Sequence, residues 1–174
     1  RRFLVRDDAT LAELHETLQI VMGWTNSHLY RFEIAGAEYV DPELFEEDFE
    51  PPLRNARRAR LRQVLGGEGF RFRYLYDFGD HWEHDLVVER VLPAEDGVSY
   101  PLCLKGKRAC PPEDCGGVWG YQQLLAVLAD PQHEERAELL RWLEGQGRSP
   151  FDPEAFDVET VNEALRNPPL LDMP

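Results

Sequence analysis

The chain has 174 residues, the usual size of one domain, and its 43% apolar and 11% aromatic residues can form a core and exclude a disordered chain. Nineteen basic residues against 33 acidic residues give a formal net charge of −14, which disfavours nucleic acid and anionic membranes as partners. The longest uninterrupted apolar stretch, residues 124–129, is too short to cross a bilayer. With no signal segment at the start, we expect a cytoplasmic protein.

The first third of the chain carries clear helix and strand signals. Thr10 and Glu13 form a capping box ahead of leucines at helical spacing, which predicts a helix. Alternation of apolar and charged residues then predicts a strand. In chain order the predicted elements are the end of a strand that begins before residue 1, at residues 1–5, a helix at 10–23, a strand at 29–34, an acidic proline-rich loop at 41–52 and a short amphipathic helix in the arginine-rich segment that begins at residue 54 and stops at Gly66-Gly67.

The strongest strand signal predicts a hairpin over about residues 70–92. Aromatic residues alternate with polar or aliphatic ones from Phe70 to Phe78, so the aromatic side chains share one face, which we expect to be buried. A second strand follows at residues 82–92, with the tip of the hairpin at residues 78–81. The remaining predicted elements are a strand at 100–104, a turn-rich loop at 105–120 and helices at 121–129, 133–144 and 158–165.

Three segments form distinctive motifs: residues 10–15 with Gly23-Trp24 and His28-Leu29, residues 76–84, and residues 110–117 with Gly120-Tyr121. Together they resemble the plasmid pRiA4b open-reading-frame-three-like family, whose members are often labelled transposon passenger or "TnpR-like" proteins. The resemblance implies an α+β fold: a helix packed on a small mixed or antiparallel sheet, with the hairpin and a helical C-terminal part. It implies little about function beyond an association with mobile elements.

We expect one domain over residues 1–174, in which residues 1–117 contain the sheet and residues 118–174 form a helical part packed on it. A serine recombinase is excluded as a reading of the "TnpR-like" label. The chain has three serines, and none has the arginine-rich surroundings of a nucleophile.

Cys103, Cys110 and Cys115 form the first candidate site. An odd number of cysteines in a chain of this size favours reduced thiols or a metal site over disulfides. Three thiolates could complete a tetrahedral zinc site with His84, His81 or His133, and the basic residues at 105, 107 and 108 would lower the thiol pKa values. The alternatives are that the cysteines are small buried apolar residues or that they carry redox chemistry.

The hairpin tip and the loop at residues 111–117, called here the Cys loop, form the second candidate, a composite polar site. Crowded carboxylates and imidazoles could bind a divalent cation or supply a general base. The alternative is structural, because Asp beside Gly favours an Asx turn and His beside Trp favours a partly buried ring. The predicted members are Tyr76, Asp77, Asp80, His81, Trp82, His84, Glu113 and Asp114.

Two weaker patterns have stronger structural explanations. Gly116 and Gly117 before a helix could bind a phosphate, but the preceding carboxylates would repel it. Arg71 and Arg73 among aromatic residues could form a stacking platform for single-stranded nucleic acid, but the alternation places the aromatic side chains in the core.

Three functional hypotheses follow. The leading one is a cytoplasmic binding or accessory module with the composite site, which could hold zinc. The second is a metal-dependent hydrolase that uses Asp77, Asp80 and His84 around an open coordination position. The third is a protein-interaction module whose acidic C-terminal face docks on a basic partner or mimics nucleic acid.

Overall fold

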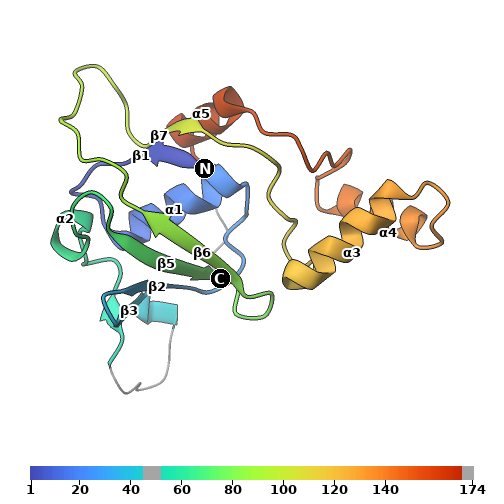
Figure 1. The fold of residues 1–174 in the computed structure, drawn as a ribbon, viewed down its shortest axis with the longest axis horizontal. Coiled ribbons are helices and arrows are strands. Elements are labelled where there is room, and N and C mark those ends of the chain that lie inside the picture. Colours follow the sequence, from blue (N-terminus) through green and yellow to red (C-terminus); the bar gives the residue numbers. More distant parts are fainter. Residues whose placement is uncertain (45–51, 170–174) are drawn as a thin grey trace.

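The fold is α+β, with one mixed sheet, a separate pair of strands, and helices, three of which follow the last strand in the chain (Figure 1). A computed structural model describes residues 1–44 and 52–169, so the predicted loop at 41–52 lies largely outside the described residues. The elements are β1 (Arg2–Leu4), α1 (Leu11–Met22), β2 (Tyr30–Ile34), β3 (Ala37–Val40), a 3-10 turn η1 (Pro42–Leu44), β4 (Arg54–Asn55), α2 (Leu61–Val64), β5 (Arg71–Tyr76), β6 (Trp82–Val87), β7 (Leu102–Lys105), α3 (Gly117–Ala129), α4 (Arg136–Gly145) and α5 (Val158–Arg166).

The larger sheet has the strand order β4-β3-β2-β5-β6. Its pairs are antiparallel except β3 with β4, which is parallel. The predicted α+β class is therefore confirmed, and β3 and β4 are strands that the sequence analysis missed. In residues 1–44 and 52–169 no helix is long and apolar enough to cross a membrane.

Helix α1 covers one face of this sheet. The predicted capping box is present: Thr10 Oγ1 accepts from the backbone N–H of Glu13, and Glu13 Oε2 accepts from the N–H of Thr10. Gly23 ends the helix with a left-handed φ of 81°. The helical stripe of apolar residues is buried, and its members are Leu11, Leu14, Leu18 and Val21.

The hairpin β5–β6 is shorter than predicted. Phe72, Tyr74 and Tyr76 are buried as the alternation requires, whereas Phe78 is 40% exposed. The strand stops at Tyr76 because Asp77 has a φ of 56°, in the left-handed region, which turns the chain out of the strand. Beyond Tyr76, alternate residues therefore no longer lie on the same face of the sheet.

Strand β1 pairs with β7 apart from the main sheet, and α5 packs on β7 and α1. The side chain of Asn162 on α5 hydrogen-bonds to the backbone of Cys103, as a neighbouring strand would. Its Oδ1 accepts from the Cys103 N–H at 2.7 Å, and its Nδ2 donates to the Cys103 carbonyl at 3.0 Å. These two hydrogen bonds hold α5 against β7.

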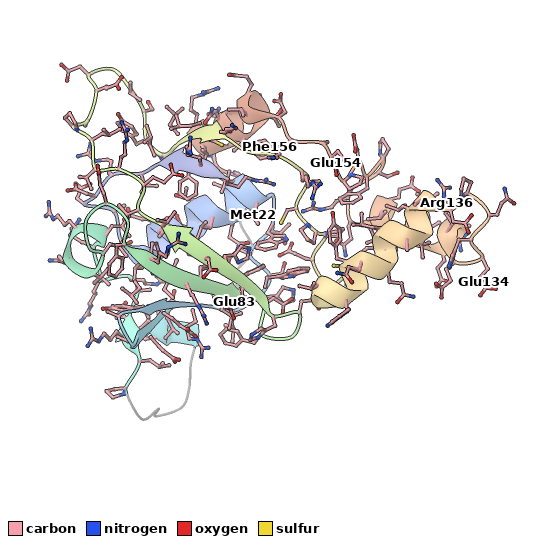
Figure 2. All side chains as sticks on the ribbon, in the orientation of Figure 1. Met22, Glu83, Glu134, Arg136, Glu154 and Phe156 are labelled. Carbon is pink, nitrogen blue, oxygen red and sulfur yellow. The ribbon has the colours of Figure 1, made fainter. Side chains whose placement is uncertain are left out.

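Helices α3 and α4 form an arm that extends to one side of the sheet (Figure 1). Figure 2 places Glu134 at the end of the arm farthest from the sheet. The chain after α4 returns to the body, where Arg148 donates to the carbonyls of Cys110 and Gly23, and Gln146 donates to the carbonyl of Glu113. Within residues 118–174, α5 thus lies on the sheet-containing part, whereas α3 and α4 project from it.

A buried polar network joins α1 to the sheet. The His15 ring stacks on Tyr30 at 3.6 Å between centroids, with Nδ1 2.7 Å from Tyr74 Oη and Nε2 2.6 Å from Asn26 Oδ1. Gln19 donates to Tyr74 Oη and accepts from the N–H of Asn26. The network therefore fixes the segment after α1, which leads directly to His28.

Stability should fall as the pH falls below neutral because of His15. Burial lowers the pKa of His15 from 6.5 to about 4, so between these values the unfolded chain binds a proton that the folded chain does not. The free energy of unfolding should drop by about 2 kcal/mol more from pH 7 to pH 5 in the natural protein than in His15→Gln. Urea denaturation at both pH values measures this, and an equal drop in both proteins would contradict the assignment.

Candidate functional site

The hairpin tip is a tight turn built around the Asp77 carboxylate. Asp77 Oδ1 accepts from the backbone N–H groups of Gly79 and Asp80, at 2.9 and 3.2 Å. The Asp77 carbonyl accepts from the His81 N–H at 2.7 Å, and the Asp77 N–H donates to the Leu29 carbonyl at 3.0 Å. The turn therefore uses one carboxylate oxygen and sets the tip beside the start of β2.

The loop before α3 packs directly on this tip, as the composite site requires. The Gly116 N–H donates to Asp80 Oδ2 at 3.1 Å. A Cβ at Gly117 would lie 2.5 Å from the Asp80 carbonyl oxygen, and Gly117 has a φ of 66°, so only glycine fits there. Gly116 and Gly117 therefore serve to pack the loop on the tip. The Gly116 N–H already donates to the Asp80 carboxylate, so it is not available to a phosphate.

Glu113 is the buried anchor of the same loop. Its Oε1 accepts from Tyr76 Oη at 2.5 Å, and its Oε2 accepts from the Thr25 N–H at 3.0 Å and from Thr25 Oγ1 at 2.7 Å. Burial, and then the neighbouring Glu113 carboxylate, raise the pKa of Tyr76, so its hydroxyl stays protonated and donates. Both Glu113 oxygens accept hydrogen bonds, which makes Glu113 a structural link between the loop, the end of β5 and the segment after α1.

His28, Asp77 and Asp114 meet beside this anchor. His28 Nε2 lies 3.1 Å from Asp114 Oδ1 and 3.6 Å from Asp77 Oδ2, which is the Asp77 oxygen that the turn does not use. The three ligand atoms all lie within 4.8 Å of one another. His28 Nε2 is buried and has no hydrogen-bond partner of acceptable geometry among the described residues. An unsatisfied buried nitrogen is costly, and a ligand between it and the two carboxylates would remove that cost.

The exposure of this metal triad (His28, Asp77, Asp114) is graded. The side chain of Asp77 is 8% exposed, that of His28 26% and that of Asp114 64%. One imidazole nitrogen and two carboxylate oxygens suit a first-row divalent ion, with solvent on the Asp114 side for further water ligands. Asp114 has a left-handed φ of 57° and directly follows the buried Glu113 in the chain.

Among the predicted composite-site residues, Asp77 and Asp114 belong to the metal triad and His28 was missed. The sequence analysis noted His28 only within a family motif. The available signal was register: Tyr30 pairs with Tyr76, which brings the residues just before β2 next to those just after β5. Antiparallel pairing of two predicted strands could therefore have placed His28 near Asp77.

The other predicted histidines lie elsewhere. His84 on β6 lies under Trp24, with ring centroids 5.5 Å apart, and burial lowers the pKa of His84. His81 is exposed, with its nearest carboxylate at Glu83, 4.0 Å away. Trp82 is buried 6.2 Å from Trp24. A hydrolase site was expected to combine Asp77, Asp80 and His84. In the structure Asp77 instead lies beside His28 and Asp114.

The predicted thiol ligands do not gather in a metal-binding group. Across residues 1–44 and 52–169 the metal triad is the only such group of three or more histidine, cysteine or acidic side chains. Cys103 lies in β7, where it pairs with β1 and where its backbone N–H donates to Asn162. Burial raises the pKa of all three thiols, to about 12 for Cys110 and Cys115, whereas the sequence analysis expected basic neighbours to lower it.

The aromatic residues among the arginines of β5 lie in the core, as the alternation predicted, and form no exposed stacking platform in the part of the chain that the structure describes. Phe72 and Tyr74 are core residues. Arg73 faces solvent and pairs with Glu83 at 3.2 Å across the hairpin. Figure 2 shows Glu83 on β6, at the start of the strand. The aromatic side chains and the arginines therefore lie on opposite faces.

Native thiols should react slowly. Because burial holds Cys103, Cys110 and Cys115 protonated at pH 8, reaction with Ellman's reagent should be about 100-fold slower in the folded protein than in urea, with half-buried Cys115 the fastest of the three. Stopped-flow absorbance on single-cysteine variants measures each rate. A native rate close to the unfolded rate at Cys110 would contradict its burial.

Comparison with known proteins agrees with this architecture. A solved structure, described as a protein of unknown function, MM3350 from Methanosarcina mazei Go1, is 37% identical with a TM-score of 0.78 and covers 92% of this chain and 87% of its own. The uncharacterized protein y4hQ of Sinorhizobium fredii is 44% identical over 166 residues, 95% of this chain and 82% of that protein. The family model of the plasmid pRiA4b ORF-3-like protein matches residues 1–160, and the chain belongs to that family.

Proposed function

We propose that this protein is a divalent-metal-binding accessory module and that its ion is held by His28, Asp77 and Asp114. The observation that carries the proposal is the buried His28 Nε2, which faces two carboxylate oxygens without a hydrogen bond of its own. A cation at this point would accept the imidazole lone pair and would neutralise the two neighbouring carboxylates.

The support around the metal triad favours a preformed site. The turn fixes Asp77 through its other oxygen, and Glu113 fixes the backbone next to Asp114. Ligands that are already oriented lose little conformational freedom on binding. The mixed nitrogen and oxygen donors favour manganese, iron or zinc over calcium, which takes oxygen ligands only.

The test is binding of Mn²⁺, which thiols bind poorly. Purified protein freed of metal should bind one equivalent, measured by the loss of the free Mn²⁺ electron paramagnetic resonance signal. His28→Asn and Asp114→Asn should each weaken binding by about tenfold or more, because the first removes the imidazole nitrogen and the second replaces a charged carboxylate by a neutral amide. Asp77 is left unchanged, since its carboxylate also holds the turn.

His81→Asn is the matched control, because His81 lies on the same tip outside the metal triad and is exposed. It should bind Mn²⁺ as the natural protein does. Equal loss of binding in His81→Asn, or undiminished binding in His28→Asn, would overturn the proposed site. Elemental analysis of protein prepared without chelator then identifies the ion.

A further inference from the structure

A hollow of about 410 Å³ lies between the two helices of the projecting arm. Residues of α3, of α4 and of the segment just before it, and of the loop at Asp114 and Cys115 line it. The hollow is largely open to solvent, so it is a surface groove and not an enclosed ligand pocket. We call this hollow the arm groove.

The arm groove combines an apolar floor with an acidic rim. Four apolar side chains line it, from Leu124, Val127, Leu139 and Trp142. Three carboxylates line it as well, those of Asp114, Glu135 and Glu138, and no Lys, Arg or His does. Glu135 and Glu138 are exposed, so their charges face solvent at the edge of the groove.

Helix α3 itself has an unusual composition for a projecting helix. It carries no charged residue in its thirteen, and only three of them are buried. Its first turn also leaves Val118 55% exposed and Trp119 81% exposed. A surface helix ordinarily turns a charged face to water, and an uncharged one is expected where another molecule covers it.

We propose that the arm groove binds a segment of a partner protein in which apolar side chains are flanked by lysine or arginine. The apolar floor would take the apolar side chains, as in helix-in-groove recognition, and the carboxylates would pair with the basic flanks. The net charge of −14 would speed the approach of such a segment.

The same charges argue against other occupants. Nucleic acid and anionic lipid would set phosphates against three carboxylates. A second copy of this chain would bring another strongly acidic surface against the rim. Asp114 is shared with the metal triad, but the proposal needs no metal, and it is tested in the presence of EDTA so that its outcome is independent of the metal site.

The probe is a fluorescein-labelled helical peptide made only of leucine and lysine in an amphipathic pattern, with a leucine–glutamate peptide as its counterpart. Fluorescence anisotropy should rise saturably with the first and stay flat with the second. Glu135→Gln combined with Glu138→Gln should weaken binding about fivefold at low salt, because two pairings are lost. Leu139→Ala should weaken it too, with circular dichroism unchanged.

Glu159→Gln combined with Glu163→Gln is the matched control, since it removes the same charge from exposed positions on α5, outside the groove. It should change the dissociation constant less than about twofold. The proposal is overturned if this control weakens binding as much as the groove variant, if Leu139→Ala binds unchanged, or if the anisotropy does not saturate. Saturable binding of a small aromatic amine without binding of the peptide would also overturn it.

Discussion

The buried carboxylate of Glu113 is the interaction on which the rest of this site depends. It accepts hydrogen bonds from Tyr76 at the end of β5 and from Thr25 after α1, so it joins three segments that are distant in the chain. A buried charge is tolerated only when it is fully hydrogen-bonded, and here both oxygens are. Because Asp114 is the next residue, the anchor also decides where its side chain can meet His28.

The acidic residues at the tip and in the Cys loop have different tasks. Asp80 holds the loop through Gly116, and Glu113 holds it through Tyr76 and Thr25. Asp77 divides its two oxygens between the turn and the metal triad, and Asp114 turns its carboxylate toward His28. Two carboxylates close together beside an imidazole nitrogen form a group that could hold a cation. Of the expected composite-site residues, Tyr76, Asp77, Asp80, Glu113 and Asp114 thus lie together, whereas His81 and His84 lie outside this group.

Local patterns predicted the elements whose physics is local. The capping box at Thr10 and the leucine stripe identified α1, and the alternation through Phe72 and Tyr74 identified the buried face of β5. The same reasoning failed at Phe78, because a left-handed residue ends the strand and breaks the alternation. It failed for the cysteines because spacing along the chain does not report which strand each one joins.

The sequence by itself determined the family motifs, the tip turn and the uncharged composition of α3, since each of these follows from neighbouring residues, and the resemblance carried by the motifs implied the α+β class. The tertiary structure decided that His28, and neither His81 nor His84, meets the carboxylates, and that α3 and α4 leave a groove with an acidic rim. The physical reason is that ligation and docking depend on distances of a few ångströms between segments far apart in the chain. Strand register, left-handed turns and a buried carboxylate set those distances; the hydrophobic pattern constrains the register, but it does not predict the turns or the hydrogen bonds of Glu113.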